Sequence, residues 1–459
     1  MHCVGKRPET NERSPKREDA KKGKMTQLEL NYETDNLFEQ LTATNTLRLG
    51  FKAVKANGGS PGVDRITIEE YGKRLDEELD RLRVELMSWT YKPQPVKRVE
   101  IPKPGGKIRL LGIPCIRDRV VQASLKLLLE PIFDPHFSES SYGFRPGRNQ
   151  EKAIKAAQKI VNTGKDYVVD IDLSNFFDRI NQDRLLERVK LKVKDKRIIR
   201  IIGMTLRSGV MTQGTLIPSD EGAPQGSPLS PLLSNIVLDE LDQELENRGL
   251  EFSRFADDCN IFLNSRKAGK RVMESVTKFI EKRMKLMVNP EKSRVAKAKH
   301  ISFLGVTIFM GEIVISGKSM ERAMAKVKEL IPRRTHKPLK SSIKEINDWY
   351  RGWSNYYKIT QYPSQLAFIE AHMRRRLRVR LIRNMKRRRT IAAKFIKKGV
   401  RRRVVRKTVF SNDGWWKMSR TYAAHTAFPN RWFAEQGLFT RSRDRLRHWF
   451  DVKEWIMIS

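Results

Sequence analysis

The sequence predicts an α+β fold, in which a mixed body of helices and short strands precedes a basic helical region. Short apolar runs bounded by turn residues over 96–113 and 167–171 are typical of strands, whereas apolar residues over 229–245 repeat at helical spacing. Beyond about residue 312 the pattern changes to helices with long basic faces. At 459 residues the chain is too long for one ordinary core, so we expect two to four domains.

Turn residues separate the expected elements. A helical pattern over 37–54 stops at Asn57-Gly58, where glycine tolerates the left-handed cap, and a second amphipathic segment covers 71–86. Two strands within 96–113 are joined by a Pro/Gly turn at 102–107. A helix is expected next, over about 118–129.

The charge balance points to polyanionic partners. Lys and Arg number 92 against 53 Asp and Glu, for a formal net charge of +39, and residues 374–406 hold 17 cations and no acid. A membrane partner is not expected, because no apolar stretch approaches the roughly 20 residues of a span. The polar first 25 residues also lack the apolar core of a signal peptide.

The cysteines indicate neither zinc nor disulfides. Cys3, Cys115 and Cys259 are far apart, which excludes a zinc framework and fits a reducing cytosol.

Two adjacent aspartates mark the candidate site. Asp257 and Asp258 lie between two short apolar runs, where a hairpin would turn, and either bind a divalent metal or make an ordinary Asx turn. A metal site needs a further carboxylate, and two are available: Asp170 within the 167–171 strand and Asp172 directly after it. Strand alternation places both on the same face. Alternation alone does not choose between them.

A stiff loop rich in Pro and Gly spans 222–235 and leads into a helix. Its Gln225 offers two donors and an acceptor to a base or a template, although a plain helix-entry loop would look similar.

Taken together, these strings resemble reverse transcriptases encoded by group II introns. The main matches are Asp172–Asp178 (DLSNFFD), Gly222–Pro231 (GAPQGSPLSP) and Phe255–Asp258 (FADD). Six further strings occur in the family's order, between roughly residues 45 and 360: Gly58–Asp64, Ile101–Lys107, Leu111–Pro114, Tyr142–Arg148, Asn289–Ser293 and Phe303–Gly305.

The resemblance implies a right-hand polymerase whose fingers and palm precede a helical thumb/maturase domain. It selects Asp172 over Asp170 as partner of Asp257 and Asp258 in a site for two Mg²⁺ ions. It also implies that Phe177 excludes a 2′-hydroxyl and favours dNTPs. Three cations take roles by the same resemblance: Lys103 and Arg109 hold the triphosphate, and Lys292 protonates pyrophosphate. Phe255 departs from the family's usual Tyr, which puts primer-end contacts or fidelity in question.

The same resemblance assigns RNA binding to the basic region. The partners implied are the group II intron RNA, a DNA primer or target, and dNTPs, in a bacterial cytosol beside the nucleoid; a homodimer stays open. The phosphate contacts are expected from five arginines: Arg374, Arg375, Arg376, Arg387 and Arg388.

The expected domain limits follow from these matches. They are a disordered basic tail (1–25), an N-terminal extension with fingers (26–165), the palm (166–311), the thumb/maturase domain (312–410) and a short nucleic-acid-binding tail (411–459). The tail carries no Cys/His-rich pattern, so an endonuclease-lacking type is expected.

The predicted function is an RNA-directed DNA polymerase that copies its intron and assists splicing and retrohoming. Two alternatives stay open: an RNA-binding splicing factor with a vestigial polymerase site, and a reverse transcriptase domesticated for defence or repair.

Overall fold

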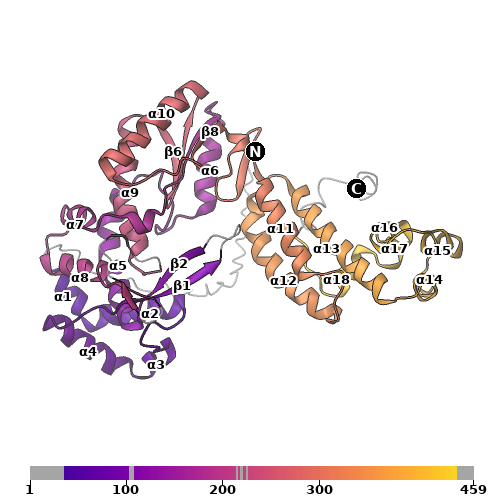
Figure 1. Cartoon of the computed structure of the whole chain (residues 1–459), viewed down its shortest axis with the longest axis horizontal. Helices are drawn as coiled ribbons and strands as arrows, with labels where there is room; N and C mark the ends of the chain where they lie inside the picture. The colour runs from indigo at the N-terminus through magenta and orange to yellow at the C-terminus, as the bar shows by residue number, and fades with distance from the viewer. Residues whose placement is uncertain (1–35, 103–107, 213–214, 218–220, 224–225, 442–459) are drawn as a thin grey trace, which may run out of the picture.

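The computed structural model describes residues 36–102, 108–212, 215–217, 221–223 and 226–441, the side chain of Arg109 aside. Lys103 and Gln225 lie outside this set. The chain forms a mixed body of helices and sheets (residues 36–315) and a helical body (residues 317–441), which lie side by side in Figure 1. The predicted α+β class is confirmed.

The first half of the mixed body is mainly helical. Its elements are α1 (Leu37–Thr42), α2 (Thr44–Asn57), α3 (Ile68–Lys73), α4 (Leu75–Met87), β1 (Val96–Pro102), β2 (Ile108–Ile113), α5 (Ile116–Phe133) and α6 (Gln150–Val161). The two amphipathic segments that looked continuous are each broken, at Ala43 and at Arg74. Periodicity alone missed these breaks because the residues on both sides bury in the same core.

The second half of the mixed body holds most of the strands. Its elements are β3 (Tyr167–Ile171), the 3₁₀ turn η2 (Phe176–Arg179), α7 (Gln182–Lys190), α8 (Lys196–Leu206), β4 (Val210–Thr212), β5 (Thr215–Ile217), α9 (Ser230–Asn247), β6 (Glu251–Phe255), β7 (Asp258–Leu263), α10 (Arg266–Phe279), β8 (Arg294–Lys297), β9 (Val306–Phe309) and β10 (Glu312–Ile315).

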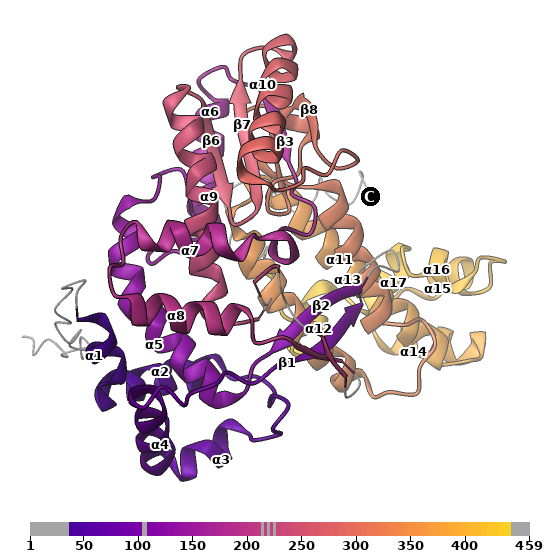
Figure 2. The same ribbon diagram turned by 60° about the vertical axis from the view of Figure 1, so that its left-hand side comes forward.

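Two four-stranded sheets frame this body. One has the order β6-β7-β3-β8 and is antiparallel throughout; the other has the order β2-β1-β4-β5, with β1 and β4 parallel. Figure 2 shows the β1–β2 hairpin reaching away from the helices toward the helical body. The predicted strand over 167–171 and the hairpin over 96–113 are thus confirmed.

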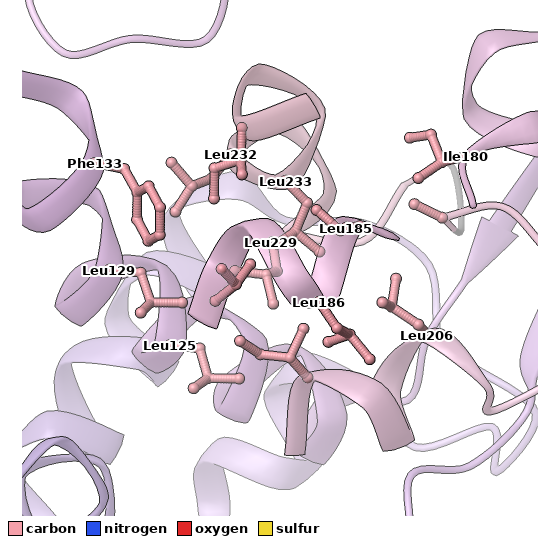
Figure 3. Packing of buried hydrophobic residues seen from close by; sticks show 14 of the residues in the cluster. Leu125, Leu129, Phe133, Ile180, Leu185, Leu186, Leu206, Leu229, Leu232 and Leu233 are labelled. Carbon is pink, nitrogen blue, oxygen red and sulfur yellow. The ribbon is translucent and has the colours of Figure 1, made fainter. Parts of the chain in front are cut away.

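One hydrophobic core joins the two halves of the mixed body. Leu125 and Leu129 of α5 pack near Leu185 of α7, Leu232 of α9 and Leu229, which directly precedes α9 (Figure 3). The expected limit between fingers and palm at residue 165 therefore does not separate two cores.

The helical body has a core of its own. Its elements are α11 (Gly317–Leu330), α12 (Leu339–Tyr356), α13 (Pro363–Asn384), α14 (Arg388–Lys397), α15 (Arg402–Val409), α16 (Trp415–Met418), α17 (Tyr422–Ala427) and α18 (Asn430–Glu435). Ile346 and Tyr350 of α12 are fully buried there. Phe428 and Phe433 bury in the same core, so the described part of the expected tail packs against α12–α15.

Candidate active site

The β6–β7 hairpin carries Asp257 and Asp258. Phe255 pairs with Asp258 across the hairpin, and Ala256 adopts a left-handed conformation (φ 57°) in the tight turn between them. Asp257 is exposed and Asp258 half-buried. The turn that the apolar runs predicted is therefore present, with both carboxylates at its tip.

Asp172 reaches this hairpin from β3. Antiparallel pairing sets Ile171 beside Cys259, so the residue after Ile171 emerges at the end where the hairpin turns. The Asp172 backbone is fixed from a third segment, because its N–H donates to Ser293 Oγ (3.0 Å) and its carbonyl accepts from the Asn289 N–H (2.8 Å). Carboxylates 85 residues apart in the sequence thus meet at one edge of the sheet.

Lys292 lies directly on Asp172. Its Nζ is 2.9 and 3.1 Å from the two Asp172 carboxylate oxygens. Sequence reasoning placed both residues in the site, and the structure brings them together as an ion pair.

The carboxylates also affect one another. Burial raises the pKa of Asp258 to about 8, and the negative charges of Asp170, Asp257 and Asp172 add to the effect. Burial raises the pKa of Asp170 to about 6 against the opposing charge of Arg294. Asp170 is therefore a fourth acid at this edge, which the resemblance had set aside.

The donor set fits a hard divalent cation in its chemistry. Carboxylate oxygens are the ligands that Mg²⁺ prefers, and crowding of negative charge is what a cation relieves. Within the described residues, however, no three His, Cys, Asp or Glu side chains converge closely enough to hold a metal ion. Asp172 is instead paired with Lys292, so metal binding requires these side chains to rearrange.

The Gly222 loop runs against the aromatic pair that follows Asp172. The Ala223 N–H donates to the Phe177 carbonyl (2.7 Å), and Gly222 lies so close that a Cβ there would be 2.9 Å from the same oxygen. Phe176 is buried, whereas Phe177 is half-buried beside it, 5.2 Å between ring centroids. Phe177 is thus the more exposed ring of the pair, and its role beside the incoming sugar stays a prediction.

Other predicted substrate contacts are placed less fully. Arg109 lies on β2, paired with Ile101 of β1, and nothing further is described of its side chain. Lys103 and Gln225, outside the described residues, remain predictions.

The five arginines expected to bind RNA do not share one environment. Arg387 is exposed and Arg374 half-buried. Arg376 is buried and donates to the carbonyls of Ile331 and Lys328. Arg388 donates to the carbonyls of Val409 and Ser411. The expectation that these cations are either phosphate-bound or solvated missed this internal use of arginine.

Arg375 is intermediate between exposed Arg387 and buried Arg376. Its guanidinium lies over the Trp416 ring, 3.7 Å from the centroid, and donates to the Trp416 carbonyl (3.2 Å). Arg333 lies over the same ring at 4.3 Å. Burial, with the nearby charges of Arg420 and Arg333, lowers the pKa of Arg375 to about 10.

Sequence reasoning missed a buried network behind the Asp–Asp turn. Arg254 is fully buried and forms an ion pair with fully buried Asp242 (Nε to Oδ1, 2.7 Å). It also donates to the Ala256 carbonyl, 2.8 Å away. The available signal was an arginine in the middle of an apolar strand, which must find internal partners.

Comparisons with known proteins agree with this geometry. Residues 101–308 match the family model described as "Reverse transcriptase (RNA-dependent DNA polymerase)", and residues 320–399 match "Group II intron, maturase-specific domain". Protein YkfC of Escherichia coli (strain K12) is 32% identical over 322 residues, which are 62% of this chain and 83% of that protein.

The chain belongs to the group II intron reverse transcriptase/maturase family. Group II intron-encoded protein LtrA of Lactococcus lactis subsp. cremoris is 29% identical over 286 residues, 59% of this chain but 47% of LtrA. Nuclear intron maturase 4, mitochondrial, of Arabidopsis thaliana is 28% identical over 179 residues, 37% of this chain and 22% of that protein. This chain thus spans under half of the length of those two relatives.

A solved structure, "Partial Cas6-RT-Cas1--Cas2 complex", matches with a TM-score of 0.35 and 22% identity, over 53% of this chain and 42% of that chain; this likeness adds nothing to the assignment.

Family membership makes the chain an RNA-directed DNA polymerase with a maturase domain, of a family that generally uses divalent metal ions. Among the described helices, none combines the length and apolar character of a membrane span.

Proposed function

We propose that this chain copies RNA into DNA at a site for two Mg²⁺ ions held by Asp172, Asp257 and Asp258. The observation that carries the proposal is the antiparallel pairing of β3 with β7, which brings the end of β3, where Asp172 follows, to the β6–β7 turn that carries Asp257 and Asp258. Two divalent ions would activate the attacking hydroxyl and stabilise the leaving pyrophosphate.

The surrounding side chains have distinct tasks in this proposal. Lys292 holds Asp172 until substrate binds and is then released toward the phosphates. Phe177 forms a wall beside the incoming sugar and excludes a 2′-hydroxyl. Lys103 and Arg109 bind the triphosphate, while Gln225 and Phe255 contact the template and primer end.

The helical body supplies the proposed grip on intron RNA for splicing and retrohoming. Exposed cations crowd α14, α15 and the turns before them, at the end of the molecule farthest from the mixed body in Figure 1. They are Arg387, Arg389, Lys394, Lys397, Lys398, Arg401, Arg402, Arg403, Arg406 and Lys407. Of the five arginines predicted from sequence, exposed Arg387 suits this role best, whereas Arg374 lies beside the buried Glu370 carboxylate (3.9 Å) and Arg375 joins Arg333 at Trp416.

Asp257→Asn tests the polymerase site. Extension of a DNA primer on an RNA template should fall by roughly 10²- to 10³-fold, since a charged group at the reacting centre is lost. Intron RNA binding should stay within about twofold, because the proposed RNA surface is unchanged. Glu321→Gln, a surface acid of α11, is the control and should extend normally.

The outcome also separates the alternatives. Full extension by the Asp257→Asn variant would overturn the metal assignment. No extension by the native chain, with splicing assistance retained, would favour the splicing factor. A gene outside any folded group II intron would favour a domesticated enzyme.

A further inference from the structure

The turn that carries the catalytic aspartates is held from behind by one buried side chain. Besides Asp242 and the Ala256 carbonyl, the Arg254 guanidinium donates to Ser141 Oγ (2.7 Å) and Asn235 Oδ1 (3.2 Å). These acceptors come from three places: the segment before α6, α9 and the turn itself. One planar group thus satisfies acceptors that no single hydrogen-bonding atom could reach.

The backbone beside Arg254 is fixed as well. The Arg254 N–H donates to the Ser140 carbonyl, and the Arg254 carbonyl accepts from the Tyr142 N–H, both at 2.9 Å. A Cβ on Gly143 would lie 2.2 Å from the Ala256 nitrogen, so only glycine lets this segment approach the turn. Asn235 binds the Gly143 carbonyl with its amide (2.9 Å) and thereby links this segment to α9.

Ala256 needs such support. A non-glycine residue in the left-handed region persists when its surroundings determine it, at a cost on the order of 1 kcal/mol or more. The Arg254 contact falls on the carbonyl of Ala256, which is the peptide group that joins Ala256 to Asp257.

From these contacts we infer that Arg254 is a positioning residue for catalysis. Its bond to the Ala256 carbonyl fixes the peptide that orients the carboxylates of Asp257 and Asp258, while its ion pair with Asp242 offsets the cost of burial. The inference rests on the proposed polymerase function for its effect on rate, but the fixing of the turn is testable without catalysis.

Arg254→Lys separates the two tasks. Lysine keeps a positive charge beside Asp242 but lacks the planar fork, so the Ala256 carbonyl loses its donor. We expect kcat for nucleotide addition to fall about 10- to 100-fold, since small misplacements at a reacting centre have effects of this size. KM for dNTP should change less than about threefold.

Asp242→Asn gives the opposite pattern. It leaves the Ala256, Ser141 and Asn235 acceptors in place but removes the balancing charge and one of the two Asp242 oxygens that accept from Arg254. Melting temperature should therefore fall more than in Arg254→Lys, while kcat falls less. Arg378→Lys, at a buried arginine of the helical body, is the matched control and should leave kcat unchanged.

A second measurement does not depend on activity. Hydrogen exchange in the peptide covering 255–259 should accelerate at least about tenfold in Arg254→Lys, with exchange in α12 and α13 unchanged. If Arg254→Lys does not fold, Ser141→Ala carries the same measurement, because it removes one acceptor and should loosen the turn mildly.

Two results would overturn the inference: unchanged exchange at 255–259, or a kcat that falls in proportion to melting temperature in both Arg254→Lys and Asp242→Asn. Accelerated exchange in a chain whose native form adds no nucleotide would leave the fixing of the turn supported and refute the proposed polymerase function instead.

Discussion

Arginine is buried in both bodies of the molecule, but with different partners. In the mixed body, Arg254 is paired with Asp242, and Arg145 with Asp134 (2.7 Å). In the helical body, Arg378 has neutral hydrogen-bond partners: the Phe428 carbonyl (2.9 Å), Asn430 Oδ1 (3.0 Å) and the ring of His425.

Burial has different consequences in the two settings. The charge of Asp242 and its hydrogen bonds hold the pKa of Arg254 above its ordinary value in spite of complete burial. Burial lowers the pKa of Arg378 to about 9, with the charge of Arg374 adding to the effect. The charge of Arg254 is thus balanced inside the mixed body, where buried Arg119 instead donates to the neutral carbonyls of Pro114 and Ser60. In the helical body all three buried arginines of α13 (Arg376, Arg378 and Arg380) donate to neutral groups. Polyanion binding should therefore stabilise the helical body preferentially.

The largest effect that tests this comparison is expected at Arg378. Arg378→Met leaves the Phe428 carbonyl and the Asn430 side chain without their donor, and should cost about 2 to 4 kcal/mol of unfolding free energy. The loss should appear in the helical body, measured by hydrogen exchange of α13 and α17. Arg389→Met, at an exposed neighbour, is the control and should change stability by less than about 0.5 kcal/mol.

An unchanged or increased stability of Arg378→Met would show that removing an unbalanced buried charge outweighs the lost hydrogen bonds. The two bodies would then differ less in how they tolerate buried arginine than the contacts indicate.

A pH change should move the two bodies in opposite directions. Burial raises the pKa of Asp118 in the mixed body to about 6, so its stabilising contribution is present below its unfolded pKa of 3.8 and is lost as pH rises through about 6. Burial and nearby cations lower the pKa of His372 in the helical body to about 4, so its contribution is present above 6.5 and is lost as pH falls toward about 4.

Acidification from pH about 6 to about 4 should therefore strengthen the Asp118 region and weaken α13, each by about 1 to 3 kcal/mol, since one pKa unit is worth about 1.4 kcal/mol. Hydrogen exchange of peptides from α5 and α13, corrected for the intrinsic rate at each pH, measures both changes. His372→Phe should reduce the acid sensitivity of α13, and the remainder should come from His425, whose pKa burial also lowers to about 4 and which contacts Arg378 of α13. If acidification changed the stability of α5 and α13 in the same direction, the comparison between the two bodies would be contradicted.

Local sequence patterns predicted the candidate site residues better than the buried contacts that hold them in place. Asp257, Asp258 and the 167–171 strand carry their signals within a few residues, through strand alternation and turn composition. The Arg254 network depends on contacts such as Arg254–Ser141, which are 113 residues apart and leave no local trace. The glycine at 143 gave no hint of its closeness to Ala256.

The basic run over 374–406 shows a different limit of prediction from sequence. Counting charges over 374–406 predicted a polyanion surface, but Arg376 and Arg380 share the buried face of α13 with Met373 and Leu377. Helical spacing contained that information, since i, i+3 and i+4 positions lie on one face. The prediction followed composition instead, because arginine is so seldom buried that a count of charges treats every arginine in the run as exposed.

The smallest effect is expected at Phe255, the residue whose departure from the family pattern raised doubt. Its ring is half-buried, with the Phe144 ring 6.4 Å away, and only its backbone pairs with Asp258. Phe255→Tyr should therefore change kcat by less than about threefold and leave melting temperature unchanged, with any effect confined to KM or misincorporation measured by single-nucleotide extension. A change in kcat above about tenfold would show that the hydroxyl reaches the reacting groups. The side chain at position 255 would then act on the reacting groups directly, in addition to the positioning of the turn that we infer for Arg254.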